Sequence, residues 1–88
     1  PQELILQPAY PNPFNPETNL VFDLPESGHV DLQVFDGKGC HVATLARGFY
    51  PAGSHLTRFN AHNLPSGIYF ARFISNDFEM VQTLTLTK

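Results

Sequence analysis

The 88-residue chain contains no tryptophan, a single cysteine and few charged side chains. Because Cys40 has no second cysteine to pair with, an intrachain disulfide is excluded, and cysteine usage indicates no redox compartment. No apolar run approaches the ~20 residues that a membrane-spanning helix needs, so we expect no membrane insertion. The net charge is −3 and the five basic residues are scattered, which argues against a nucleic-acid-binding face.

The length of the chain fits one small domain. It begins at Pro1 without an initiator methionine, and we recognise no signal peptide, so we expect a module taken from a longer protein. A domain of this size buries only about 60% of its unfolded surface. Eight phenylalanines and three tyrosines compensate, because each aromatic side chain buries a large area.

No segment has helical periodicity, and short alternating segments recur about every ten residues with turn residues between them. Leu20, Phe22 and Leu24 alternate with polar neighbours, which is typical of a half-buried strand. The expected strands are 18–24, 30–35, 41–46, 54–60, 68–74 and 78–87, preceded by an edge strand or extended segment at 3–7. We expect 18–24 and 30–35 to pair through the turn at 25–28, and 47–53 to form a loop.

This spacing of strands predicts an all-β fold, an immunoglobulin-like antiparallel sandwich of about seven strands. The Cys and Trp residues of true antibody domains are missing. Tyr69, near the start of the next-to-last strand, is a candidate for the tyrosine corner of such sandwiches. Three glycines, Gly39, Gly53 and Gly67, are expected in turns.

A proline-rich segment precedes the first clear strand, with the sequence Tyr10, Pro11, Asn12, Pro13, Phe14, Asn15 and Pro16. Proline fixes its own φ and disfavours helix in the residue before it, so this segment is expected to be extended and rigid. We interpret it as a plug that inserts Tyr10 and Phe14 into the core. A proline-rich linker is the alternative interpretation. Residues 1–17 would then form the lead-in and 18–88 the sandwich.

The proline-rich segment and the strands after it resemble a known family. The segment 10–16, followed by Thr18, Leu20, Phe22 and Leu24-Pro25, is similar to the opening of the type A C-terminal sorting domain of the type IX (Por) secretion system. The resemblance continues through residues 30–36, Gly39, Val42, Leu45, Gly48, Ala52-Gly53, His55 and 66–69, and covers nearly the whole chain. The pattern is shared with immunoglobulin-like domains related to the flagellar hook-capping protein. Cys40, Phe59 and Ala61 stand where the family usually has arginine, tryptophan and glycine.

The resemblance implies a non-catalytic address label without cofactor or metal. Such a domain ends a secreted protein of Bacteroidetes-type bacteria and directs the cargo before it, through the periplasm, across the outer membrane. The implied partners are the type IX translocon and a sortase-like surface peptidase, which removes the domain so that the cargo is released or attached to the cell surface. Because the family signal resides at the tail, Leu84, Leu86 and Lys88 are hypothesised to be recognised.

The residues give less support to catalysis, to metal binding or to glycan binding. Cys40 and His41 are adjacent, and adjacent strand residues point to opposite faces, which argues against a catalytic thiol. The four histidines lack metal-ligand spacing, and we expect three at the surface and His55 in a hydrogen bond that anchors a turn. Asp36 is expected to cap its turn. The alternative function is a glycan-binding or structural accessory module of a secreted hydrolase, which an exposed platform of Phe35, Phe49, Tyr50 and Phe70 would support.

Overall fold

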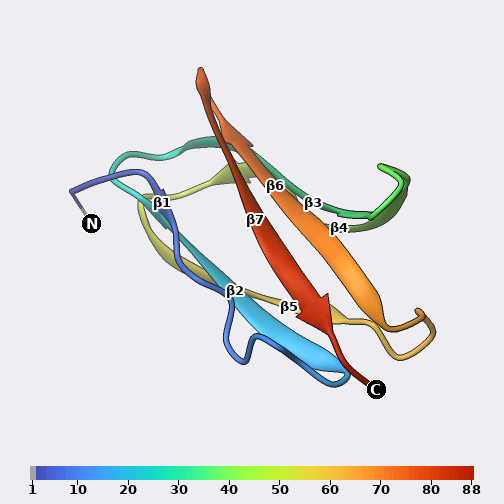
Figure 1. Ribbon diagram of the computed structural model, residues 1–88. Helices are drawn as coiled ribbons and strands as arrows, with labels where there is room; N and C mark the ends of the chain where they lie inside the picture. Colours follow the sequence, from blue (N-terminus) through green and yellow to red (C-terminus); the bar gives the residue numbers. More distant parts are fainter. Residues whose placement is uncertain (1) are drawn as a thin grey trace.

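The computed structural model describes residues 2–88, and this part of the chain is a sandwich of two β-sheets (Figure 1). The all-β prediction is confirmed. The seven strands are β1 (Ile5–Leu6), β2 (Glu17–Leu24), β3 (Gly28–Asp36), β4 (His41–Tyr50), β5 (Gly53–Asn60), β6 (Gly67–Ser75) and β7 (Phe78–Leu86). No helix capable of crossing a membrane occurs among the described residues.

The two sheets have three and four strands. The first has the order β1-β2-β5 and the second the order β4-β3-β6-β7, and all pairs of neighbours are antiparallel. Inward-facing residues alternate with outward-facing ones along β2 and β3, as expected for strands with one face on a core. The order is that of an immunoglobulin-like sandwich, in which consecutive strands often belong to opposite sheets.

The expected pairing of β2 with β3 is wrong. The two strands lie in different sheets, and β2 is paired with β1 on one side and β5 on the other. Pro25 follows β2 directly and cannot donate a ladder hydrogen bond, so the chain leaves the first sheet there. Leu20 and Phe22 of β2 and Leu32 and Val34 of β3 therefore enter the same core from opposite sheets.

Strand β4 is longer than expected, because residues 47–50 continue the strand instead of forming a loop. Arg47 pairs with Asp31, and Tyr50 pairs with Gly28. Gly48 suggested a loop, yet it lies within the ladder with φ 128°. The register with β3 slips twice, leaving Val42 and Leu45 without partners, so β4 carries two bulges.

The expected turn between β3 and β4 is confirmed, and a tight turn also joins β6 to β7. The Asp36 carboxylate accepts hydrogen bonds from the backbone N–H groups of Lys38 and Cys40, each at 2.9 Å, and so caps its turn. Gly39 adopts φ 86°, a conformation in which a Cβ is strained. Asn76, in the tip between β6 and β7, is left-handed with φ 55°, which asparagine tolerates well.

Aromatic rings form the middle of the core. Phe14 packs on Phe59 at a centroid distance of 5.7 Å, and Phe59 in turn packs on Tyr69 at 6.2 Å. The Tyr69 hydroxyl donates a 2.6 Å hydrogen bond to the carbonyl oxygen of Pro65, four residues upstream, so the predicted tyrosine corner is present. Burial, with a smaller contribution from the Asp36 charge, raises the pKa of Tyr69 and keeps the hydroxyl protonated as a donor.

Candidate functional site

The segment from Ala9 to Pro16, here called the strap, connects the edges of the two sheets. Tyr10 pairs with Asn19 of β2 through two backbone hydrogen bonds of 3.1 and 3.0 Å. Four residues later, the Phe14 N–H donates to Thr85 O at 2.9 Å, and Phe14 O accepts from the Thr87 N–H at 3.0 Å. The lead-in runs along β2 and reaches the C-terminal end of β7 in Figure 1. The strap therefore closes one open side of the sandwich.

Two side-chain amides join the strap region to β7 in a reciprocal way. Asn12 Nδ2 donates to Thr83 O, and Asn12 Oδ1 accepts from the Thr85 N–H, both at 3.0 Å. In the opposite direction, Gln82 Nε2 donates to Gln7 O at 3.0 Å, and Gln82 Oε1 accepts from the Ala9 N–H at 2.5 Å. Each amide uses one donor and one acceptor here, as the backbone of a strand residue does, so each replaces a missing strand partner.

The two aromatic residues of the strap have opposite environments. Phe14 is 2% exposed and packs into the core, whereas Tyr10 is 79% exposed. The expectation that Tyr10 inserts into the core is wrong, because its pairing with Asn19 places the side chain on the outer face of the three-stranded sheet. Pro11, Pro13 and Asn15 are exposed, and the Pro16 carbonyl accepts from the Ala61 N–H at 2.8 Å.

The sequence analysis did not predict two residues that hold the strap in place. Thr18 is buried, and its hydroxyl donates a 2.6 Å hydrogen bond to Pro11 O. Gln82 lies on the inward stripe of β7 between Met80 and Leu84. A polar residue on an otherwise apolar inward stripe must find a partner, and this signal could have identified Gln82. Thr18 continues the inward stripe of Leu20, Phe22 and Leu24, so the same signal applies to it.

The three tail residues hypothesised as recognition residues fall into two groups. Leu84 is 0% and Leu86 1% exposed, so the folded domain presents neither side chain to a partner. Lys88 is exposed, and its Nζ donates to His62 O at 2.7 Å while its N–H donates to the Ser66 hydroxyl at 3.0 Å. The end of the chain is thereby fastened to the loop between β5 and β6.

The other residues singled out from the sequence lie away from the strap. Gly53 begins β5 and Gly67 begins β6, with φ 129° and 153°. Gly39 belongs to the turn between β3 and β4. The His55 ring nitrogen Nε2 contacts Pro51 O at 2.7 Å, which confirms the expected anchoring of a turn by His55. These residues shape separate turns and do not converge on a common site.

We expect Asn12→Asp to lower the free energy of unfolding by about 1 kcal/mol, because a carboxylate cannot donate to Thr83 O and leaves that carbonyl without this partner. Asn15→Asp is a matched control. It makes the same change of charge three residues away, where the exposed side chain has no hydrogen bond among the described residues, and should shift stability by under ~0.5 kcal/mol. Urea denaturation measures both, and equal effects would contradict the role of the Asn12 amide.

A second polar group ties the lead-in to the three-stranded sheet. The Asp23 carboxylate accepts hydrogen bonds from the Ser54 hydroxyl at 2.6 Å and from Gln7 Nε2 at 3.0 and 3.2 Å. These bonds lower the pKa of Asp23 below its ordinary value of 3.8, and the bond from Ser54 has the largest effect.

The lowered pKa of Asp23 has a consequence for acid stability. A carboxyl with a depressed folded-state pKa stabilises the domain above its unfolded-state pKa, and this contribution is lost as the pH falls through the folded-state value. In Asp23→Asn the contribution is absent at every pH. The difference in melting temperature between wild type and variant should therefore be present at pH 6 and shrink below pH 3.8. A difference that does not change with pH would contradict this prediction.

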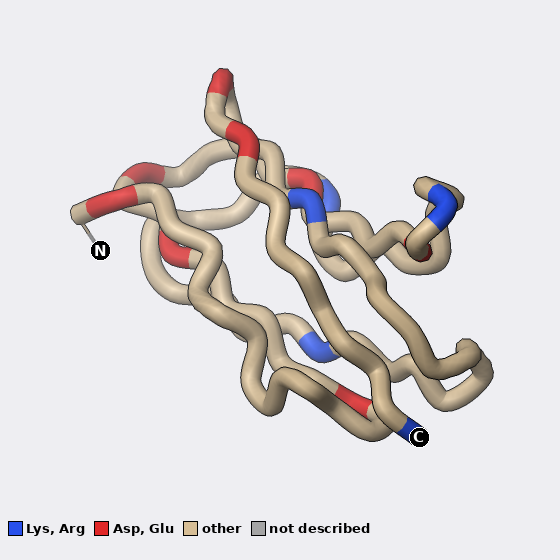
Figure 2. Tube along the Cα trace, viewed as in Figure 1, with Lys and Arg blue, Asp and Glu red and all other residues tan. Residues whose placement is uncertain are grey.

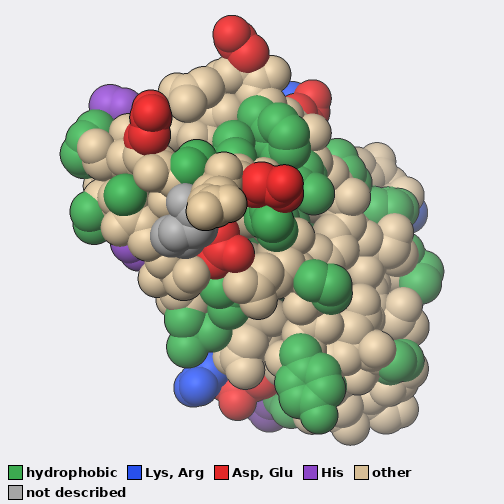
Figure 3. All heavy atoms as spheres, turned by 90° about the vertical axis from the view of Figure 1, so that its left-hand side faces the viewer, with side chains coloured by type: hydrophobic (Ala, Val, Ile, Leu, Met, Phe, Trp, Pro, Cys, Tyr) green, Lys and Arg blue, Asp and Glu red, His purple; other side chains and the backbone are tan. Residues whose placement is uncertain are grey.

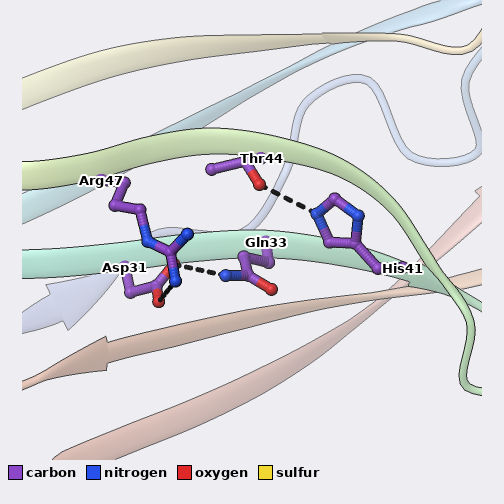
Figure 4. A network of polar contacts seen from close by, with 5 residues as sticks. All are labelled: Asp31, Gln33, His41, Thr44 and Arg47. Atoms are coloured by element: carbon purple, nitrogen blue, oxygen red, sulfur yellow. Dashed lines mark hydrogen bonds and ion pairs between the residues drawn. The ribbon is translucent and has the colours of Figure 1, made fainter.

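The polar residues on the outer face of β3 and β4 do not form a catalytic arrangement. Arg47 and Gln33 both direct donors at Asp31, at 3.4 and 2.9 Å, while His41 turns toward the Thr44 hydroxyl at 2.8 Å (Figure 4). The Asp31 carboxylate thus accepts from Arg47 and Gln33 and does not contact the His41 imidazole. A nucleophile–base–acid triad would need a carboxylate that orients the imidazole. Among the described residues no three His, Cys, Asp or Glu side chains come close enough to hold a metal ion.

Neither the basic residues nor the exposed aromatic residues gather on one face of the molecule. The basic residues come from a turn, three different strands and the C-terminal residue, and Figure 2 shows no face on which they gather. Of the four aromatic residues considered for a glycan platform, only Phe49 is largely exposed. Tyr50 packs edge-on against Phe22 at 5.3 Å, and Phe35 packs against His41 at 5.8 Å. The four rings therefore do not form an exposed platform.

These observations define a class of protein: a small immunoglobulin-like β-sandwich module whose N-terminal strap and C-terminal strand are interlocked. A family model described as a secretion system C-terminal sorting domain matches residues 8–87. The chain belongs to this family, the C-terminal sorting domains of type IX secretion, and acts as a sorting signal. Cargo of this family lies N-terminal to the domain in the same chain and is secreted or displayed on the cell surface. None of the curated proteins matches the chain at a significant level.

Proposed function

We propose that the type IX translocon recognises this domain in its folded form, after the cargo has reached the periplasm. A sortase-like surface peptidase then separates the domain from the cargo, which is released or attached at the cell surface. The domain contributes no chemistry of its own. The observation that carries the proposal is the position of Leu84 and Leu86, since a tail that is part of the core can act as a signal only through the fold it completes.

Within this proposal the tail residues have different roles. Leu84 and Leu86 position the last strand, and Lys88 fixes the end of the chain against the loop between β5 and β6. The groups available for recognition are then those that the strap and β7 expose together. Tyr10, Phe78 and Val81 are the exposed large hydrophobic residues of the strap and β7. Seen from the side of the lead-in, hydrophobic side chains form several separate groups among polar atoms (Figure 3).

Export of a reporter tests the proposal. Residues 1–88 are fused behind a periplasmically targeted fluorescent protein in a bacterium that has the type IX system, and the cells are fractionated. Fluorescence at the surface or in the medium that disappears in a translocon-deficient strain is the expected result. Retention of a folded fusion in the periplasm of the competent strain would overturn the proposal.

A further inference from the structure

The strap covers only part of the open edge of β7. Its hydrogen bonds go to Thr83 O, to both backbone groups of Thr85 and to the Thr87 N–H. Successive strand residues direct their backbone groups to opposite edges, and the register between β6 and β7 has no shift. The N–H and C=O groups of Glu79 and Val81 therefore point toward the same edge as those of Thr85. Beyond the strap, this stretch of edge has no strand partner among the described residues.

The open stretch lacks the features that protect edge strands. Such edges are usually protected by proline, by lysine, by bulges or by inward-pointing charges. Residues 78–82 contain no proline and no lysine, and Glu79 on the outer face is paired with Arg72 of β6. Val81 is 60% exposed beside it. The opposite edge of the same sheet differs, because the two bulges of β4 interrupt it.

The strap itself is an example of an extended segment bound at the edge of β7. Phe14 forms a parallel β-bridge with Leu86, so an extended segment of the domain itself already pairs with the C-terminal end of β7. It is bound by main-chain hydrogen bonds and by one amide that imitates them. Extended peptides commonly join exposed sheet edges in this way, with main-chain bonds supplying affinity and alternate side chains supplying specificity.

We propose that the edge of β7 at Glu79–Val81 receives an extended segment of the export apparatus, which adds a strand to the four-stranded sheet. The inference depends on the proposed function, because it names the kind of partner that reads the folded domain. The added strand bonds to the N–H and C=O groups of Glu79 and Val81. It places a β-branched or aromatic side chain against Val81, since such cross-strand pairs are favourable.

A proline at position 81 distinguishes this edge from the ladder that holds β7 in the fold. The Val81 N–H points away from β6, so Val81→Pro removes a donor from the open edge without removing a ladder bond, as prolines on edge strands do. Val81→Thr is the matched control, because it keeps the backbone donor and the β-branched shape. Melting temperatures of both variants establish that the domain remains folded.

The experiment has two parts. In the purified domain, amide hydrogen exchange should be fast at Glu79 and Val81 and slow at Thr85 and Thr87. In the fusion expressed in a type IX host, Val81→Pro should reduce export at least about tenfold, because a proline both removes a donor and blocks close approach. Val81→Thr should be exported within about twofold of wild type.

The outcomes separate the two proposals. Folded Val81→Pro exported as well as wild type would overturn the inference and leave the proposed function standing. Should Val81→Pro unfold, Val81→Lys replaces it, because an edge lysine deters strand addition while keeping the backbone donor, and unchanged export of that variant would overturn the inference. Slow, concentration-dependent exchange at Val81 in the purified domain would show that a second copy occupies the edge, which also overturns it. A wild-type fusion that is not exported would overturn the proposed function and the inference together.

Discussion

Replacing Phe14 by alanine is expected to lower the free energy of unfolding by about 3–5 kcal/mol, the usual cost of deleting a buried phenylalanine side chain. Phe14 is 2% exposed and packs against Phe59, which itself contacts the ring of Tyr69. The substitution removes the aromatic contact and leaves a cavity where the strap meets the core. Chemical denaturation of the purified domain measures the change.

The control for this experiment lies in the same segment. Tyr10→Ala deletes an aromatic side chain of similar size that stands in solvent, and should change stability by under ~0.5 kcal/mol. A loss of under ~1 kcal/mol in Phe14→Ala would contradict the role of the strap as a part of the core. A large loss in Tyr10→Ala would contradict the exposed position of that ring.

Removing residues 84–88 is expected to abolish both the cooperative unfolding transition and export. Leu84 and Leu86 are buried, and each contributes about 1.5–3 kcal/mol through burial. The truncation also removes the groups that bond the Phe14 backbone and the side-chain oxygen Oδ1 of Asn12. A small domain has a total stability of only about 5–15 kcal/mol, so losses of this size leave little of it.

The matched variant for the truncation is Lys88→Ala, which removes the terminal cation and its bond to His62 O but keeps the last strand. This variant should remain folded, with a loss of under ~1 kcal/mol, because the bond is exposed to solvent. Calorimetry and the export assay are applied to both proteins. A truncated domain that melts cooperatively and is exported would contradict the account.

The alternation of hydrophobic residues was enough to predict where the strands lie, apart from the second half of β4, and which face of β2 is buried. It could not identify neighbours, because alternation specifies the face of a strand and not the sheet that contains it. Strands β2 and β3 follow each other in sequence and have similar patterns, yet they face each other across the core. Only the long-range partners of β2, on β1 and β5, decide the sheet to which it belongs.

The strap marks a second limit of sequence reasoning. An irregular segment has no period, so nothing local indicates that Phe14 enters the core while Tyr10 does not. That outcome depends on the partners, Asn19 for Tyr10 and the C-terminal strand for Phe14. The roles of Asn12 and Gln82 depend in the same way on residues more than seventy positions away. Local turn chemistry was more informative, as the Asp36 cap and the Tyr69 corner show.

The C-terminal leucines are proposed to act in sorting through the fold that they complete, without being read as side chains. Export of a Leu84→Met fusion in a type IX host tests this claim most directly. Methionine has nearly the same volume as leucine and usually costs less than ~1.5 kcal/mol in a core, so the domain should stay folded. Export of this fusion should equal that of wild type. A folded Leu84→Met domain that is retained in the periplasm would contradict the account, because it would show that the leucine itself is recognised.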